Sequence, residues 1–103
     1  MIVYNVEGCD SAGVQAMMAE GRRVLGAIPG VREAVTGEAV TADAAYGYSW
    51  LVRFCHPAVI DSYRDHPAHV AFADQSFRPV AGDRLTIDYQ AIEAGNQDRR
   101  VTA

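Results

Sequence analysis

The sequence contains no lysine, and all nine of its basic residues are arginines. A Schiff-base mechanism needs a lysine amine, so lysine-dependent aldol chemistry is excluded. The formal net charge is -4 and the arginines form no basic block. The cluster of positive charge that neutralises nucleic-acid phosphates is therefore missing, and we expect neither DNA nor RNA as a partner.

Cysteines and long apolar runs are also scarce. The two cysteines, Cys9 and Cys55, are too few for a disulfide framework, and we expect both to be reduced thiols. No apolar stretch approaches the roughly 18 residues that indicate a membrane-spanning helix. Residues 1–7 lack the basic start and apolar run of a signal peptide. The sequence thus predicts a cytoplasmic protein without a membrane partner.

The remaining composition is typical of a globular chain. Its 103 residues are 50% hydrophobic and 21% charged, which fits one compact domain with a core of its own. We expect that domain to occupy residues 1–91 and a polar C-terminal tail to follow over residues 92–103.

The spacing of apolar residues predicts four strands and two helical regions. β-Branched, aromatic or alternating stretches predict strands over residues 2–6, 31–40, 46–54 and 85–89. Asp10 or Ser11 can cap a helix that ends before Pro29-Gly30, and a second helical region follows Pro57. The order predicts an α+β, ferredoxin-like split βαβ fold (βαββαβ), with an antiparallel four-stranded sheet that carries its helices on one face.

The third predicted strand places a row of rings on one face. The row contains Tyr46, Tyr48, Trp50 and Phe54. We expect it to lie on the sheet face that the helices leave uncovered. Burial of apolar area stabilises a protein by about 25 cal/mol per Å², and a row of rings left in water would not contribute this stabilisation. A second copy of the chain would cover the row, so the pattern predicts a two-fold homodimer whose interior Trp50 lines.

Tyr63, His66 and His69 form the one dense polar cluster of the chain, which has three histidines in all. Pro67 follows His66 and disfavours a helical conformation at that residue. The three side chains are therefore expected at a bend between two short helices, where they could project into a cleft.

The stretch Tyr-x-x-His-Pro-x-His from Tyr63 to His69 resembles the stress-responsive dimeric α/β-barrel (Dabb) family. Further parts of the resemblance, which covers roughly residues 2–90, are Pro29-Gly30-Val31, Gly47-Tyr48 and Asp88-Tyr89. The resemblance implies a dimeric α/β barrel, in which the sheets of two copies face each other, and many members have no established activity.

One characterised relative in the family, a plant polyketide cyclase, has a similar stretch and uses no metal or organic cofactor. This resemblance implies, as the alternative to a binding protein, a cyclase-like or isomerase enzyme with His69 as a general base and Tyr63 as the donor that holds an enolate oxygen. Imidazole titrates near pH 6.5, which suits proton transfer at neutral pH. Trp50 stands where a pocket histidine is expected, so the cyclase's substrate does not carry over. We expect a small apolar or carbonyl-containing ligand near Tyr63 and His69, contacted by His66, Trp50, Tyr48 and Phe72.

Two other interpretations of the cluster stay open. Its imidazoles could cap backbone groups that Pro67 leaves free, with the phenol bound to a carbonyl, which would make the cluster structural. A metal site is disfavoured, because His66 and His69 supply two ligands and zinc sites usually take at least three from protein. No phosphate-binding loop is present either, so we expect no metal and no cofactor.

Overall fold

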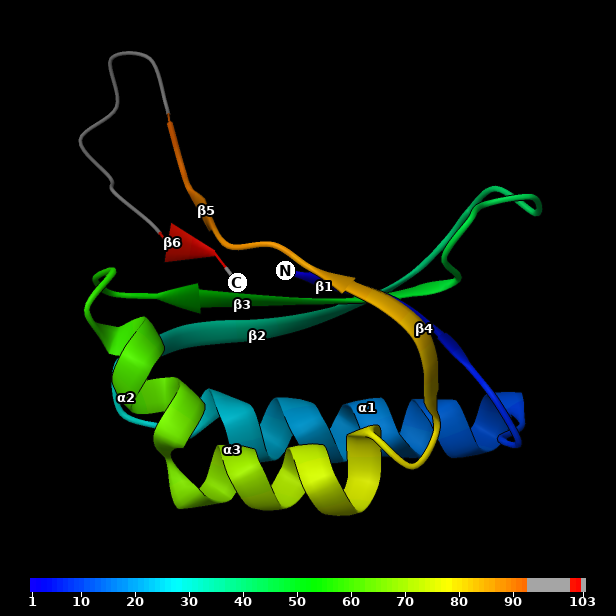
Figure 1. The fold of residues 1–103 in the computed structure, drawn as a ribbon, viewed down its shortest axis with the longest axis horizontal. Coiled ribbons are helices and arrows are strands. Elements are labelled where there is room, and N and C mark those ends of the chain that lie inside the picture. The colour runs from blue at the N-terminus through cyan, green and yellow to red at the C-terminus, as the bar shows by residue number, and fades with distance from the viewer. Residues whose placement is uncertain (93–100, 103) are drawn as a thin grey trace.

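The protein folds as one antiparallel sheet with a layer of helices on one side, described by a computed structural model over residues 1–92 and 101–102 (Figure 1). Its elements are β1 (Ile2–Val6), α1 (Ser11–Gly26), β2 (Val31–Glu38), β3 (Tyr48–Phe54), α2 (Val59–Asp65), α3 (Pro67–Phe72), the π-helical segment η1 (Ala73–Phe77), β4 (Ala81–Thr86), β5 (Tyr89–Gln90) and β6 (Val101–Thr102). The predicted ferredoxin-like α+β fold is confirmed.

The four main strands lie in the order β4-β1-β3-β2, and all neighbouring pairs are antiparallel. The short strand β6 pairs with the end of β3 and with β5. It belongs to the polar tail predicted over residues 92–103, of which residues 93–100 and 103 lie outside the described residues. Within the described ranges, no helix is both long and apolar enough to cross a membrane.

Local sequence explains where α1 begins and where the chain turns after it. The Asp10 carboxylate accepts a hydrogen bond from the Gly13 backbone N–H at 2.8 Å and caps the helix. Gly30 adopts a φ of +87°, a conformation that glycine takes without steric cost. A Cβ atom at Gly30 would also lie 2.5 Å from Val59. The turn therefore needs glycine both for its backbone and for its contact with α2.

Several predicted strand limits differ from the structure. β2 ends at Glu38 and β3 begins at Tyr48, so the connecting loop is longer than predicted. The last strand was predicted over residues 85–89, but β4 already begins at Ala81, which pairs with Val6, and it ends at Thr86. Both cysteines are free thiols.

The predicted position of the aromatic row is wrong. Trp50 and Phe54 are 3% and 0% exposed within a single chain, on the face that the helices cover. Trp50 meets Phe72 of α3 edge-on, with ring centroids 5.8 Å apart. A Cβ atom at Gly21 would lie 2.3 Å from the Trp50 ring, so this helical glycine makes room for the indole. Tyr46 precedes β3 and is half-buried.

The opposite face of the sheet carries a different apolar set. We call it the open sheet face: Val3, Val35, Leu51, Leu85 and Ile87. Leu85 lies opposite Val3 and Val35 lies opposite Leu51 in the strand register. Val35, Leu85 and Ile87 are 39%, 48% and 41% exposed. Figure 1 shows all the labelled helices on the other side of the sheet, so aliphatic side chains rather than rings face outward.

Candidate functional site

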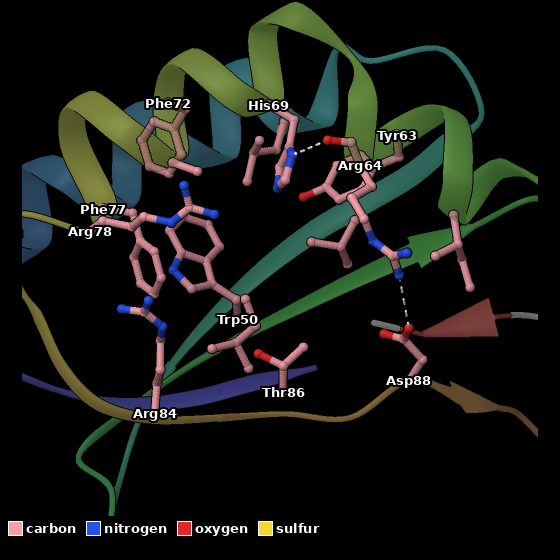
Figure 2. Close-up of a pocket in the computed structure, with 15 residues that line it drawn as sticks. Trp50, Tyr63, Arg64, His69, Phe72, Phe77, Arg78, Arg84, Thr86 and Asp88 are labelled. Atoms are coloured by element: carbon pink, nitrogen blue, oxygen red, sulfur yellow. Dashed lines mark hydrogen bonds and ion pairs between the residues drawn. The ribbon is translucent and has the colours of Figure 1, made fainter.

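A pocket of about 270 Å³ lies between the sheet and the second helical region (Figure 2). Its apolar lining consists of Ile2, Leu25, Trp50, Val52, Ile60, Phe72, Ala73 and Phe77, and its polar lining of Tyr63, Arg64, His69, Arg78, Arg84, Thr86 and Asp88. Small-molecule sites usually measure about 300–1,000 Å³, so this pocket suits a ligand of one or two rings.

The bend that the Pro67 pattern predicts lies at the roof of the pocket. His66 separates α2 from α3 with an extended backbone, φ -64° and ψ 133°, as the residue before a proline favours. Its Nδ1 accepts a hydrogen bond from the Ala68 backbone N–H at 3.1 Å and caps α3. His66 does not line the pocket, so its geometry matches the capping interpretation rather than ligand contact.

This bend packs Tyr63 of α2 against His69 of α3. The two ring centroids are 4.5 Å apart and the ring planes meet at 40°. Tyr63 is also held by Phe54, which meets it edge-on at 4.9 Å, and is 9% exposed. Both side chains line the pocket. The pair predicted as catalytic is thus brought together at one cavity.

The backbone fixes the orientation of the His69 ring. Nδ1 of His69 lies 3.0 Å from the carbonyl oxygen of Arg64. A carbonyl oxygen only accepts hydrogen bonds, so Nδ1 carries the proton in this contact. Nε2 then holds the lone pair whenever the ring is neutral. Figure 2 shows the second ring nitrogen pointing away from the backbone and toward the pocket.

The Tyr63 hydroxyl is a proton donor held in an apolar setting. Burial raises the pKa of Tyr63 above its ordinary value, so the phenol keeps its proton at neutral pH. Across residues 1–92 and 101–102, its contacts are ring contacts with Phe54 and His69 rather than a hydrogen bond. The carbonyl partner expected for a structural phenol is therefore not found in this part of the chain.

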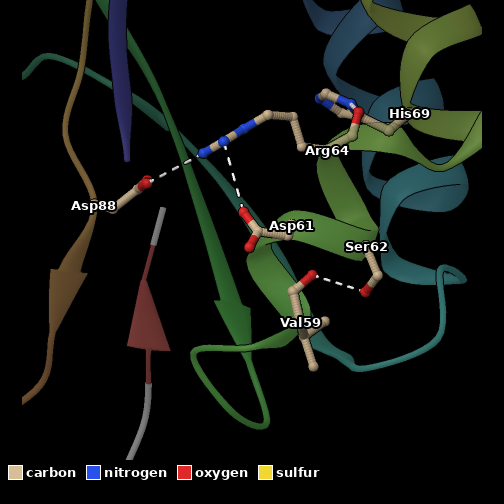
Figure 3. Close-up of polar contacts among 6 residues, drawn as sticks. All are labelled: Val59, Asp61, Ser62, Arg64, His69 and Asp88. Carbon is tan, nitrogen blue, oxygen red and sulfur yellow. Dashed lines mark hydrogen bonds and ion pairs between the residues drawn. The ribbon is translucent and has the colours of Figure 1, made fainter.

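One end of the pocket is bounded by an ion pair. The Arg64 guanidinium lies 3.8 Å from the Asp88 carboxylate and 3.7 Å from that of Asp61 (Figure 3). The Arg64 and Asp88 side chains are 61% and 39% exposed, so water weakens their attraction. The guanidinium links α2 to the segment after β4 across this end of the pocket.

The other end holds two more guanidinium groups, which we call the cationic end: Arg78 and Arg84. Arg78 is paired with the Asp74 carboxylate. The Arg84 guanidinium lies over the Phe77 ring, 5.9 Å from its centroid. Among the described residues, no carboxylate forms an ion pair with Arg84.

A wide helical turn places Phe77 and Arg78 at this end. The Arg78 backbone N–H bonds to the Ala73 carbonyl at 2.8 Å, five residues earlier, so η1 is a π-helical turn. Such turns insert one extra residue into a helix and often occur at functional sites. The turn lets Phe72, Ala73, Phe77 and Arg78 all line the pocket.

The structure assembles part of the predicted site. Tyr63, His69, Trp50 and Phe72 line the pocket, whereas Tyr48 and His66 do not. Tyr48 instead packs against Tyr4, at 5.9 Å between ring centroids. Sequence reasoning missed the arginines and Asp88. The alternation in β4 could have indicated Arg84, because Arg84 and Thr86 share one face of the strand and Leu85 lies on the other.

The side chains of the pocket suit an organic ligand. In the described ranges, no group of three or more His, Cys, Asp or Glu side chains is placed to hold a metal. The pocket instead combines aromatic walls, one neutral phenol, one imidazole and guanidinium groups. Such a site can stack a flat molecule and donate hydrogen bonds to its oxygens.

Fold and pocket together define a ferredoxin-like α+β domain with a cavity beneath its helices. The family model of the Stress responsive A/B Barrel Domain (Dabb) matches residues 6–91. The chain belongs to this family. No curated protein matches the sequence.

Solved structures repeat the fold. A Dabb family protein with a ferredoxin-like fold from Mesorhizobium loti is 25% identical, with a TM-score of 0.78 over 89% of this chain and 93% of that one. A dimeric ferredoxin-like protein of unknown function from Thermobifida fusca is 19% identical, with a TM-score of 0.69 over 82% and 80%. A dimeric protein of unknown function from Bacteroides fragilis is 16% identical, with a TM-score of 0.65 over 85% and 89%.

Proposed function

We propose that the protein is a homodimeric small-molecule-binding module whose ligand occupies the pocket beside Tyr63 and His69. The main support for this proposal is the pocket, where the Tyr63 phenol and the His69 imidazole lie beside aromatic side chains. Trp50 and Phe72 offer flat apolar surface, and the Tyr63 hydroxyl is a donor for a carbonyl oxygen. A small apolar or carbonyl-containing molecule suits this lining.

Trp50 provides the test, because it is the one tryptophan of the chain and lines the pocket. Small aromatic and 1,3-dicarbonyl compounds are titrated while tryptophan fluorescence and melting temperature are recorded. Ligands should change the fluorescence and raise the melting temperature, with weaker effects in Tyr63→Phe and His69→Ala. His56→Ala is the matched control, since His56 is exposed and lies outside the pocket. The binding proposal fails if no compound changes either signal.

The homodimer is proposed on two grounds. The open sheet face leaves aliphatic side chains in water on the side without helices, and apolar area of this kind gains about 25 cal/mol per Å² on burial. The Thermobifida fusca and Bacteroides fragilis proteins of the same fold are dimeric. A second copy packed face to face would bury Val35, Leu85 and Ile87.

Sedimentation velocity at micromolar concentration tests the dimer. Wild-type protein should sediment at twice the chain mass, and Leu85→Glu should shift it to monomer, because a carboxylate would be buried without a partner. Val40→Glu is the matched control: Val40 is fully exposed in the loop between β2 and β3. A wild-type monomer at this concentration would refute the assembly.

A second candidate function is cofactor-independent proton transfer, which the His69 geometry favours. With Nδ1 bonded to the Arg64 carbonyl, neutral His69 presents its Nε2 lone pair as a base. Nε2 would take a proton from the carbon between two carbonyls, and the C–H electron pair would delocalise as an enolate. The neutral Tyr63 hydroxyl would donate a hydrogen bond to the enolate oxygen. The enolate carbon could then attack a third carbonyl further along the same molecule, forming the C–C bond as that C=O becomes an alkoxide, and His69 would return the proton to the alkoxide.

Proton transfer has a direct readout in deuterium exchange. A cyclic 1,3-diketone in D₂O should exchange its central C–H protons faster with wild-type protein than with buffer alone, as followed by NMR. His69→Gln should lose the acceleration and Tyr63→Phe should reduce it. Equal exchange rates with wild type and His69→Gln, under conditions where the diketone perturbs Trp50, would leave a binding protein without this chemistry.

A further inference from the structure

The charges around the pocket are distributed unequally. The chain has a formal net charge of -4, yet the pocket is lined by three arginines and one acidic residue. Arg64 lies beside Asp88 and Asp61, and Arg78 is paired with Asp74. Arg84 contacts the Phe77 ring without a carboxylate partner in the described ranges. One guanidinium at the pocket therefore keeps its capacity for an anion.

The position of Arg84 follows from strand geometry. Arg84 pairs opposite Tyr4, and Thr86 opposite Ile2, so both side chains face the helices from edge strand β4. Leu85, between them, faces the other side. Figure 2 shows the Arg84 guanidinium at the same end as Phe77 and Arg78, with Asp88 at the opposite end. Phe77 is 7% exposed, and its ring gives the exposed Arg84 side chain one cation–π contact.

The structure assigns a ligand class to the site proposed above: a small aromatic carboxylic acid whose carboxylate is bound by Arg84, with its ring in the pocket against the side chains of Trp50 and Phe72. This inference rests on the proposed binding function and adds the chemical identity of the ligand. An arginine guanidinium donates two parallel hydrogen bonds to a carboxylate. The ring would reach toward the Tyr63 and His69 pair from the cationic end.

A carboxylate fits this end better than a phosphate. Phosphate esters carry close to two negative charges and are usually held by several donors. Arg78 and Arg64 are already engaged with carboxylates of the protein, which leaves one guanidinium for one negative charge. The cavity of about 270 Å³ lies just below the range of about 300–1,000 Å³ that is usual for small-molecule sites. This space suits a single-ring acid rather than a nucleotide.

The test compares each acid with its own amide. Benzoate, phenylacetate and 3-phenylpropanoate, and the three corresponding carboxamides, are titrated against the protein by calorimetry and Trp50 fluorescence. We expect at least one acid to bind at least tenfold more tightly than its amide. Arg84→Gln should weaken the binding of that acid by about tenfold or more, since it removes charge-assisted hydrogen bonds to the carboxylate, and should leave the binding of the amide unchanged.

Arg22→Gln is the charge-matched control. It removes the same positive charge from α1, where Arg22 donates to Thr36 outside the pocket, and it should bind the acid as wild type does. Amides that bind as tightly as the acids, or acid binding that survives Arg84→Gln, overturn the inference and leave the binding function intact. Equal losses in Arg22→Gln and Arg84→Gln also overturn it, because they would reflect net charge. If neutral compounds also fail to perturb Trp50, the binding function itself falls.

Discussion

His69 stacks against Tyr63 at 4.5 Å between ring centroids while its Nδ1 donates to the backbone carbonyl of Arg64, the residue that follows Tyr63. Two neighbouring residues of α2 thus fix both the position and the tautomer of one imidazole in α3. The contact crosses the Pro67 bend, so a break in the helix brings the pair together. A single continuous helix would place residues six apart on different sides.

His66 is expected to act on stability through the bend. His66→Ala removes the Nδ1 acceptor for the Ala68 N–H, and loss of an N-cap acceptor costs about 1 kcal/mol. His66→Asn keeps an acceptor and should recover most of the loss. Urea unfolding followed by circular dichroism measures both variants. An alanine variant as stable as wild type would show that this hydrogen bond does not stabilise the bend.

Gly21 is expected to resist substitution although it lies within a helix. Gly21→Ala would bring a methyl group against Trp50 and Phe72, and overpacking of this kind costs about 1–3 kcal/mol. Gly26→Ala is the control, because nothing lies within 4 Å of its Cβ position; it should be neutral or stabilising by up to about 1 kcal/mol. Thermal unfolding of both variants gives the comparison, and a stabilised Gly21→Ala would contradict the packing of Trp50.

Stability should fall in alkaline solution because of Tyr4. Burial raises the pKa of Tyr4 to about 12, with a smaller contribution from Tyr48 that the Trp50 indole opposes. Below pH 10 the phenol is protonated in both states, so it adds no pH dependence. Between pH 10 and 12 the unfolded chain releases the proton and the folded chain keeps it. Tyr4 then lowers the free energy of unfolding by up to about 1.4 kcal/mol per pH unit. Tyr63, whose pKa burial also raises, adds a loss of its own above pH 10.

Tyr4→Phe tests this origin of the alkaline loss. The variant lacks the phenol and should give a flatter curve of urea midpoint against pH between 10 and 12. At pH 7 it should be at least as stable as wild type, because the buried hydroxyl makes no hydrogen bond of ordinary geometry with the described residues. Identical alkaline curves for the two proteins would assign the loss to other groups.

The Arg64 and Asp88 ion pair is expected to matter little for stability. Asp88→Asn should change the free energy of unfolding by less than about 1 kcal/mol, since exposed ion pairs contribute about 0–1 kcal/mol. The difference from wild type should shrink further in 1 M salt, which screens exposed charges. Urea unfolding at low and high salt measures it. A salt-independent loss of several kcal/mol would instead mean that the pair is buried in solution.

The sequence was sufficient for the fold because each element has a local cause. The Asp10 cap, the Gly30 turn and the Pro67 bend all depend on residues within a few positions. The two faces of the sheet were not assigned correctly, because alternation separates a strand into two faces without stating which one the helices cover. Trp50 was therefore expected at the dimer interface, although it lies in the core and lines the pocket.

The cationic end of the pocket was not predicted for the same reason, namely that the sequence does not state which face of a strand the helices cover. In β4 and just after it, the apolar residues Leu85 and Ile87 point outward, while Arg84 and Thr86 face the helices. An interpretation that places apolar residues in the core would turn Leu85 and Ile87 toward the helices. It would therefore assign the two faces of this strand the wrong way round. Tyr63 and His69 could be predicted because their chemistry is clustered in sequence, whereas Arg84 joins them through strand pairing alone.

The π-helical turn after Phe72 sets the rotational phase of the residues at its C-terminal end. Each residue of an α-helix advances the chain by about 100°, so the extra residue in this turn rotates Phe77 and Arg78 by about that angle relative to an uninterrupted helix. A chain of the same length that closed this turn as an ordinary α-helix could keep the same fold and the same Tyr63 and His69 pair while pointing different side chains at Arg84. Relatives with the same number of residues here but without the wide turn would therefore be expected to differ in ligand rather than in architecture.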